Sequence, residues 1–346
     1  MPYSKNDREN LTPRERPTPT LSIVVPCYNE EESLPFLLEG IDKLNENLLA
    51  TGRIEQPLTL WLVDDGSADR TWELIKTTTA RFEISGIKLS RNHGHQYALL
   101  AGLMQADGDV IVSMDADLQD DPNAAGEMID HYRKGSEIVF GVRASRTTDS
   151  ALKRKTAQGY YRLLSILGVD LIPDHADYRL MSRKARDTLA SFGESNLYLR
   201  GLVHKLGFQT SIVTYDRAER SAGESKYNLR RMISLAIDGI TSFSVRPLRL
   251  ITLSGFFIAA ASFLFIAYAL VAWFMGETIP GWASTTLPIY FLGGAHLIAL
   301  GVIGEYIGKI YTETKARPRF IIDTTIHNDA NETAKPEAAP NQKAAE

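Results

Sequence analysis

Two long uncharged stretches near the C-terminal end constrain this chain most. Residues 250–276 carry no charged side chain over about 27 positions, whereas a helix needs roughly 20 apolar residues to cross a bilayer. Residues 287–304 are also uncharged, and the run stays apolar through Ile310 with only Glu305 and Lys309 interrupting it. A buried pair of core helices is the alternative, but a short Gly/Pro-containing turn between two such runs favours a membrane hairpin. We predict two transmembrane helices within residues 248–312.

Basic residues flank this predicted hairpin on its outer sides. They are Arg230, Arg231, Arg246, Arg249, Lys309, Lys315, Arg317 and Arg319. The connecting loop carries only Glu277. Because Lys and Arg collect on the cytoplasmic side of a membrane, we predict a multi-pass protein of the inner (cytoplasmic) membrane with both termini in the cytoplasm.

The segment before the first span has helical apolar spacing and begins with basic residues. This segment, residues 229–243, reads LRRMISLAIDGITSF. Such a pattern is typical of an amphipathic helix that lies in the membrane interface. Packing of the same helix against a protein core is the alternative. We assign residues 229–247 to an interfacial helix.

The N-terminal part of the chain alternates short apolar runs with amphipathic segments. The runs that end abruptly in polar or acidic residues, as buried parallel strands do, are residues 21–25, 58–63 and 110–114. The segments with helical spacing are residues 31–48, 71–82, 96–105 and 123–133. Alternation of strand and helix predicts an α/β domain with a mostly parallel, Rossmann-like sheet over residues 21–228.

Both ends of the chain are polar. Residues 1–20 are rich in proline and contain no apolar stretch that could act as a signal peptide. The sequence from about Asp323 onward is polar and poor in aromatic residues, so it offers little to offset the entropy of ordering. We therefore predict disorder in residues 1–20 and in most of a cytoplasmic tail, residues 313–346.

Acidic and amide side chains follow the predicted strands at the points where the strands end. They are Asn29, Asp64, Asp65, Asp115 and Asp117. In a doubly wound sheet, ligands bind beyond the carboxyl ends of the strands, so these side chains should converge on one crevice. Two carboxylates two residues apart can share a hard divalent cation, which in turn neutralises a diphosphate.

The charge balance limits what this crevice can bind. With 38 basic and 42 acidic residues, the chain lacks the basic footprint of a non-specific nucleic-acid-binding protein. A single cysteine, Cys27, excludes an intramolecular disulfide, and no Cys/His spacing is typical of zinc sites. Anionic substrates must be held by local clusters of cations, of which there are two: Arg143, Arg146, Lys153, Arg154 and Lys155, and then Arg217, Arg220 and Lys226 around residues 221–225. A solvated helix face is the alternative for the first cluster.

Seven motifs together resemble one family. They are VPCYNE (25–30), DDGS (64–67), RNHGHQ (91–96), DAD (115–117), ADYRLM (176–181), GESKY (223–227) and GEYIG (304–308). The chain resembles family 2 glycosyltransferases of the GT-A fold over roughly residues 21–322. Within that family it is similar to the polyprenyl-phosphate branch, which includes bactoprenol glucosyltransferases and dolichol-phosphate mannose synthases.

The resemblance implies a role for each matching position. The nucleotide-sugar would be bound by Pro26, Tyr28, Glu30, Asp64, Asp65, Asn92, Gly94, Asp115 and Ala116. Mg²⁺ or Mn²⁺ would be bound by Asp115, Asp117 and Gln119, although a surface glutamine is an equal alternative for Gln119. The acceptor phosphate would be bound by Arg143, Arg154, Arg217 and Ser225. Catalysis would involve Asp177, Asp117, Arg220 and Lys226, the last two from a loop that closes over the diphosphate.

Asp177 matches the position usually assigned as the base in this family. A phosphate monoester has a second pKa of about 6 and is already ionised at neutral pH, so it barely needs a base. Asp177 could instead orient an arginine or a sugar hydroxyl, or form a structural ion pair with Arg179. We interpret the histidines His93, His95 and His175 as helix-start or packing residues rather than metal ligands, because no histidine spacing forms a site.

The resemblance also implies the reaction. The expected enzyme is an inverting hexosyltransferase that moves a sugar to undecaprenyl or another polyprenyl phosphate, with UDP-glucose as the first choice of donor and UDP-N-acetylglucosamine as the second. GDP-mannose and UDP-aminoarabinose are further donors. A processive polysaccharide synthase and an inactive membrane scaffold are alternative functions. The family resemblance also implies a homo-oligomer, a tetramer, whose helices approach closely at small residues.

Overall fold

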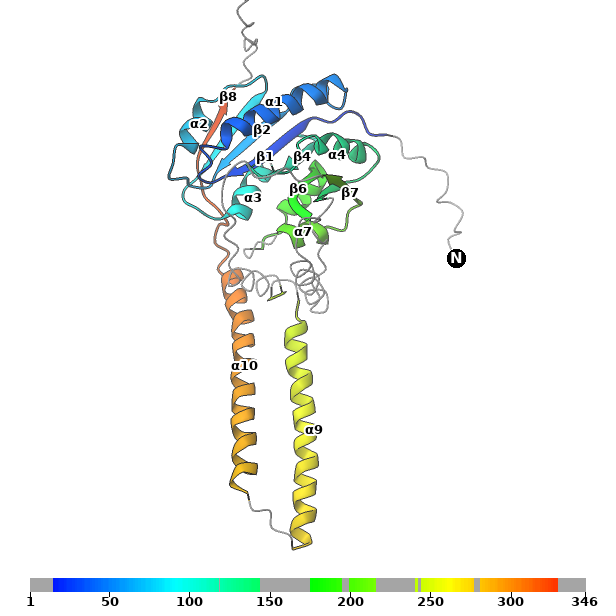
Figure 1. Cartoon of the computed structure of the whole chain (residues 1–346), viewed down its shortest axis with the longest axis vertical. Coiled ribbons are helices and arrows are strands. Elements are labelled where there is room, and N and C mark those ends of the chain that lie inside the picture. The colour runs from blue at the N-terminus through cyan, green and yellow to red at the C-terminus, as the bar shows by residue number, and fades with distance from the viewer. Residues whose placement is uncertain are drawn as a thin grey trace, which may run out of the picture.

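The computed structural model describes residues 15–117, 119–143, 175–194, 199–215, 240–241, 244–276 and 281–328. These residues form an α/β domain around an eight-stranded sheet, from which two long helices extend in the same direction (Figure 1). The strand order is β7-β5-β6-β4-β1-β2-β3-β8. The predicted α/β class with a mostly parallel sheet is confirmed.

The parallel centre of the sheet consists of β1 (Leu21–Cys27), β2 (Thr59–Asp64), β3 (Glu83–Leu89) and β4 (Val110–Ser113). β1 lies between β2 and β4 and pairs with both in parallel. All seven of its residues are buried. A strand covered on both faces has no face for polar side chains, which explains the continuous apolar runs in the sequence.

Helices cover the two faces of the sheet. One face packs against α1 (Leu34–Ala50), α2 (Thr71–Thr77) and α4 (Ala124–Arg133). The other face packs against α3 (His95–Gln105), α6 (Arg183–Ala190) and α7 (Leu199–Lys205). The four helices expected from the sequence are therefore present, but α2 ends five residues early. Thr78 is already extended, with ψ of 135°, because a run of β-branched threonines leads into β3, a strand that the sequence analysis did not identify.

The second part of the sheet consists of β5 (Ile138–Arg143), β6 (His175–Ser182) and β7 (Thr210–Tyr215). β6 runs antiparallel between β4 and β5, and β7 pairs in parallel with β5. The sequence analysis did not identify β6 or β7. β6 matters most for function, because it brings Asp177 to the edge of the sheet beside β4.

Both predicted disordered ends are wrong in part. β8 (Ile322–Asn328) pairs antiparallel with β3 and completes one edge of the sheet. At the other end of the chain, Arg16 donates hydrogen bonds to Glu137 and to the carbonyls of Gly135 and Ser136. The open edge of β3 offers unpaired backbone groups, and bonding to them offsets the entropy cost that led us to expect disorder. Residues 1–14 and 329–346 lie outside the described residues.

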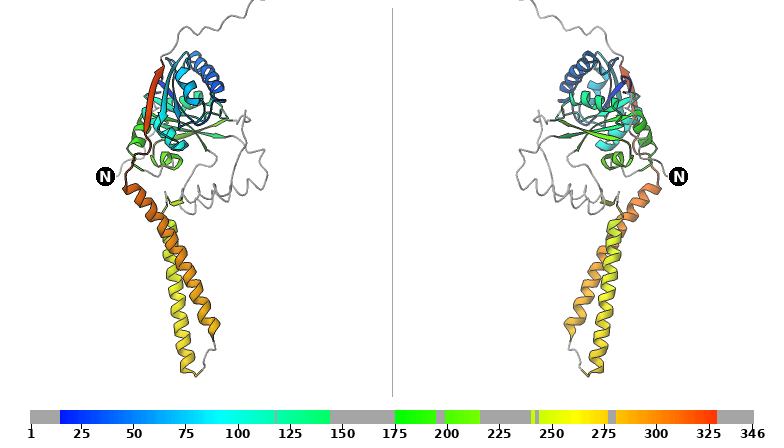
Figure 2. Two further views of the ribbon diagram at one scale, coloured as in Figure 1. Left: turned by 90° about the vertical axis from the view of Figure 1, so that its left-hand side faces the viewer. Right: turned by 90° about the vertical axis from the view of Figure 1, so that its right-hand side faces the viewer.

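The two long helices are α9 (Arg246–Phe274) and α10 (Trp282–Thr314). They lie side by side, away from the sheet, as the views in Figure 2 show. Among the described residues, these two helices are long and apolar enough to cross a membrane. Their most apolar stretches are not buried inside the protein. α10 contains the second uncharged stretch, residues 287–304, and α9 contains all but the last two residues of the first, residues 250–276. Of the predicted interfacial helix, residues 229–247, only positions 240–241 and 244–247 are described, and Arg246 already begins α9.

Candidate active site

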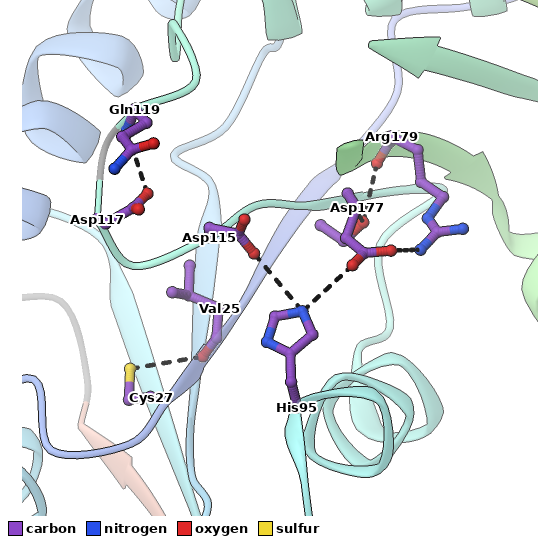
Figure 3. A network of polar contacts seen from close by, with 9 residues as sticks. Val25, Cys27, His95, Asp115, Asp117, Gln119, Asp177 and Arg179 are labelled. Carbon is purple, nitrogen blue, oxygen red and sulfur yellow. Dashed lines mark hydrogen bonds and ion pairs between the residues drawn. The ribbon is translucent and has the colours of Figure 1, made fainter. Parts of the chain in front are cut away.

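The carboxyl ends of β1, β2 and β4 meet at one edge of the sheet, and β6 brings Asp177 to the same place (Figure 3). Asp64 ends β2, while Asp115 and Asp117 follow β4. Because β6 is antiparallel to β4, it is the beginning of β6, not its end, that reaches this edge. The sequence prediction that the acidic residues converge on one crevice is consistent with this geometry.

The turn after β1 is bonded to the loop after β2. Asn29 adopts a left-handed conformation with φ of 54°, which asparagine tolerates better than most residues. Its backbone N–H donates to Ser67 Oγ at 3.0 Å, and its side-chain oxygen accepts from the backbone N–H of Ala68 at 2.8 Å. Pro26 stays in β1, and Tyr28 is 48 % exposed. The turn that follows β1 thus presents an exposed aromatic ring.

Asp65 shapes the loop that precedes α3. Its buried carboxylate accepts hydrogen bonds from the backbone N–H groups of His93 (2.7 Å) and Gly94 (2.9 Å). Gly66 has φ of +69°, and a Cβ there would lie 2.6 Å from the backbone of Arg91 and Asn92. Asp65 therefore has a positioning role that the sequence did not reveal, and its predicted contact with a nucleoside stays a prediction.

Neighbouring Asp64 and Glu30 line the same loop. Asp64 Oδ1 accepts from the backbone N–H of Ser67 at 3.1 Å. Its Oδ2 is shielded from solvent and has no hydrogen-bond partner among the described residues. Burial raises the pKa of Asp64, and burial together with nearby Asp117 raises the pKa of Glu30. Asp64 Oδ2 is consequently available to a donor group of a ligand.

Asp115 lies in surroundings that disfavour its negative charge. A third of its side chain is accessible, but Oδ1 is shielded and makes no hydrogen bond within the described part of the chain. Burial raises its pKa to about 6; the nearby carboxylates of Asp177, Asp120 and Asp117 add to the rise, and His95 opposes it. A positive ion would relieve this crowding of negative charge.

The predicted metal ligands lie close in the chain, but the described residues do not bring three acidic, histidine or cysteine side chains into one ready metal site. Asp117 Oδ1 accepts a hydrogen bond from the backbone N–H of Gln119 at 3.2 Å. Gln119 is buried, with 2 % of its surface exposed, so it is not the solvated glutamine of the alternative hypothesis. Two carboxylates and a buried amide fit a hard divalent cation with water completing its shell.

Asp177 forms the ion pair that the sequence analysis weighed as one of its roles. Its Oδ1 lies 2.8 Å from Arg179 Nη2, and Arg179 is completely buried. The hydroxyl of Ser113 donates to the backbone carbonyl of Asp177 at 2.5 Å and ties this end of β6 to β4. The guanidinium fixes one oxygen of the carboxylate, and the other, Oδ2, is directed toward His95 (Figure 3).

His95 is the residue that the sequence reading undervalued. It begins α3, as expected of a helix-start residue, but its side chain extends to the acidic cluster. Nε2 lies 3.4 Å from Asp177 Oδ2 and 3.6 Å from Asp115 Oδ1. The sequence could have indicated this role, because ligands bind beyond the carboxyl ends of parallel strands and the next helix begins there. His93 behaves differently: burial and then Arg91 lower its pKa.

The remaining predicted residues divide into two groups. Asn92 is exposed beside the crevice, Gly94 has φ of +99° at the start of α3, and Ala116 is buried between the two aspartates. Arg143 ends β5, but its side chain lies outside what the structure describes. The other predicted phosphate-binding and loop residues lie entirely outside the described residues: Arg154, Arg217, Arg220, Ser225 and Lys226.

Comparison with known proteins places this site in a family. The family model described as "Glycosyl transferase family 2" matches residues 22–190. The uncharacterized glycosyltransferase YkoT of Bacillus subtilis is 46 % identical over 90 % of this chain and 93 % of its own length. The bactoprenol glucosyl transferase of Shigella phage SfX is 38 % identical over 87 % of this chain and 98 % of its own.

Among solved structures, the mannosyltransferase PcManGT from Pyrobaculum calidifontis, in complex with GDP-Man and Mn²⁺, overlaps with a TM-score of 0.45 at 14 % identity and covers 85 % of each chain. That overlap is too loose to support an argument about the site. The chain belongs to glycosyltransferase family 2, and it resembles the bactoprenol glucosyltransferases within that family.

Proposed function

We propose that this protein transfers glucose from UDP-glucose to a polyprenyl phosphate, of the undecaprenyl type, at the cytoplasmic face of a membrane. The observation that carries the proposal is the meeting of Asp115, Asp117 and Asp177 at one sheet edge, in a chain 38 % identical to a bactoprenol glucosyl transferase over 87 % of its length. A donor diphosphate and an acceptor phosphate need adjacent but separate sites, and in this proposal Asp115 and Asp117 serve the first while Asp177 serves the second.

The donor half of the site consists of residues that are already ordered by backbone contacts. Asp64 Oδ2 is free to accept a hydrogen bond from the base or ribose of a nucleotide, and Tyr28 offers an exposed ring for stacking. Asp115, Asp117 and Gln119 would hold Mg²⁺ or Mn²⁺. Such an ion, when bound, neutralises charge on the leaving nucleoside diphosphate.

The acceptor half centres on Asp177. The buried Arg179 keeps its carboxylate in place, and a phosphate that arrives ionised does not need to lose a proton there. We propose that Asp177 orients an arginine or a sugar hydroxyl while the phosphate oxygen attacks the anomeric carbon from the side opposite the diphosphate. A single displacement of this kind inverts the anomeric configuration. Cations predicted from the sequence would hold the phosphates: Arg143, Arg154, Arg217, Arg220 and Lys226, together with Ser225.

The exposed helices α9 and α10 would anchor the domain where the acceptor is found. The isoprenoid tail of the acceptor stays in the bilayer, so an anchored enzyme meets it by a local search. Both helices begin or end next to basic residues, Arg246 and Lys315, which favours a cytoplasmic position for the α/β domain. A homotetramer in the membrane is part of the proposal, since small residues on α10 would let helices approach closely.

A panel of donors and acceptors tests the proposed function. Purified protein in nanodiscs, with Mg²⁺ or Mn²⁺, receives labelled UDP-glucose, UDP-N-acetylglucosamine, GDP-mannose or UDP-aminoarabinose, with and without undecaprenyl phosphate. We expect a lipid-linked monosaccharide, formed fastest from UDP-glucose. Polymer would indicate a processive synthase, and no product from any donor would indicate an inactive scaffold. Faster transfer from another donor would correct the sugar and keep the reaction class.

A further inference from the structure

The imidazole of His95 lies between the two halves of the proposed site. Nε2 is 3.6 Å from Asp115 Oδ1, on the donor side, and 3.4 Å from Asp177 Oδ2, on the acceptor side. The same nitrogen faces both carboxylates, as Figure 3 shows. The three residues come from the start of α3, the loop that follows β4 and the start of β6.

The position of His95 is fixed from its own side as well. The two residues before it, His93 and Gly94, donate their backbone N–H groups to the buried carboxylate of Asp65. The backbone at the start of α3 is therefore held to the loop after β2. Asp177 is held from the opposite side by Arg179 at 2.8 Å. The backbone beside His95 and the carboxylate of Asp177 are thus each held in place by other residues.

The single N–H group at Nε2 can donate a strong hydrogen bond to only one of the two carboxylates at a time. Neither distance is yet that of a strong hydrogen bond, and catalytic contacts are often long until substrates bind. Asp115 Oδ1 has no hydrogen-bond partner among the described residues and is a proposed metal ligand. Once a cation neutralises Asp115, Asp177 is the one of these two carboxylates that stays anionic beside the Nε2–H group. A neutral imidazole with hydrogen on Nε2 is sufficient for this.

We propose that His95 is a positioning residue that couples the two halves of the site: it is shared by Asp115 and Asp177 before the donor is loaded and serves Asp177 alone afterwards. In that state His95 and Arg179 hold the two oxygens of Asp177 from opposite sides, which fixes the carboxylate against the acceptor. This inference rests on the proposed function. It assigns His95 neither to the metal nor to the reacting atoms.

Two substitutions of similar length separate positioning from simple space filling. His95→Gln keeps an N–H donor near the position of Nε2, whereas His95→Met fills the same space without a donor. The exposed His204 on α7 provides a control outside the site, as His204→Gln. All variants are compared as full-length protein in nanodiscs, with thermal melting to confirm that each is folded.

The two readouts are the rate of transfer to undecaprenyl phosphate at saturating substrates and the affinity of Mn²⁺ for the protein in the presence of UDP without acceptor. For His95→Met we expect a rate loss of more than tenfold, about 30-fold for a lost hydrogen bond to a charged group. We expect Mn²⁺ affinity to be unchanged or up to about threefold tighter, because Asp115 is no longer shared. His95→Gln should transfer at least about three times faster than His95→Met.

Three results would overturn the positioning role: a loss of tenfold or less in His95→Met, equal rates in the Gln and Met variants, or a weakening of Mn²⁺ binding by more than about threefold, which would make His95 a metal ligand. Failure of the proposed function looks different. In that case wild-type protein forms no lipid-linked sugar at all, and the role of His95 falls with it.

Discussion

The sheet and the α9–α10 pair use the same kinds of apolar residue in opposite ways. In β1, Ile23, Val24 and Val25 are completely buried. In the helix pair, Phe263 and Leu297 expose 76 % and 73 % of their surface. Protein covers the first group, and nothing in the described part of the chain covers the second. Exposed apolar surface on this scale needs another apolar medium, so the comparison separates a protein core from a surface suited to lipid.

The polar residues divide in the same way. Buried and half-buried carboxylates gather at the carboxyl edge of the sheet, while the candidate spans are almost free of charge. We infer that residues at the edge of the sheet carry out the reaction and that the two helices anchor the domain at the membrane. Damage to the sheet edge should stop turnover without releasing the protein from the membrane. Damage to the helices should release the protein and slow transfer to the lipid acceptor while leaving UDP binding intact.

The largest effect is expected from Asp117→Ala. Loss of a proposed metal carboxylate removes several kcal/mol of stabilisation from the leaving group, so turnover should fall by about a thousandfold or more at saturating Mg²⁺. The fold should persist, because the side chain makes only a local hydrogen bond to Gln119. The exposed Asp107, before β4 at the opposite end of the strand, gives a matched control as Asp107→Ala. Near-normal turnover in Asp117→Ala would refute the metal site.

The reverse result is expected when charge enters both helices. Each arginine at the middle of a span costs roughly 2.5–3.5 kcal/mol of insertion free energy, so the double variant Phe263→Arg/Leu297→Arg should lose about 5–7 kcal/mol. We expect most of the protein to leave the membrane fraction after carbonate extraction and transfer to undecaprenyl phosphate to fall at least tenfold. UDP binding should change little. Full retention in the membrane, as in a Phe263→Leu/Leu297→Phe control, would break the comparison.

A moderate effect is expected from Asp177→Asn. If the acceptor phosphate arrives ionised, the acidic limb of the rate profile follows the acceptor with an apparent pKa of about 6. The variant should then lose about 10- to 100-fold near pH 6 and recover much of that as pH rises. The measurement is single-turnover rates across a pH series with both substrates saturating. A loss of roughly a thousandfold at every pH, with both substrates still bound, would make Asp177 an obligatory base.

The smallest effect concerns stability and involves Asp115. Its pKa is raised to about 6, above the value of about 3.9 in unfolded chains. The folded protein therefore favours the protonated form, and the cost of the ionised form appears as pH rises from about 4 through 6. Without metal at pH 7.5, Asp115→Asn should raise the melting temperature by about 2–4 °C, for about 1 kcal/mol once the exposed part of the side chain is allowed for.

That gain has two internal controls. It should shrink steadily as the pH falls from 7.5 towards 4, because the wild-type carboxyl then becomes protonated in the folded protein. It should also be offset by Mn²⁺ with UDP, which would stabilise the wild-type protein but not the variant. A wild-type protein that melts at the same temperature as Asp115→Asn at pH 7.5 without metal would show that the carboxylate is already compensated.

The sequence predicted β1, β2 and β4 well, because each of these strands is a short apolar run that ends at or just before a candidate site residue. Asp64 and Asp115 are identifiable in this way from neighbouring positions alone. β6 is different, since it carries Asp177 in its interior and reaches the edge only because it runs antiparallel to β4. The contact of His95 with Asp177 spans 82 positions and depends on three elements, so no local pattern encodes it.

The edge strand β8 was missed for a related reason. Its residues read as a polar tail, with Ile322 and Ile326 as the inward-facing positions. Their alternation is too short to indicate a strand by itself. It becomes a strand because the open edge of β3 is there to receive it, which is a property of the folded sheet and not of the segment.

The most direct test of the central claim follows both reactants into one product. Wild-type protein in nanodiscs is given UDP-glucose labelled with ¹⁴C in the sugar and undecaprenyl phosphate labelled with ³²P, and the lipid products are separated. The account predicts one new lipid carrying both labels in equal molar amounts, formed by the wild-type protein and absent with Asp117→Ala. Sugar label released as free glucose, or several sugars per phosphate, would contradict it.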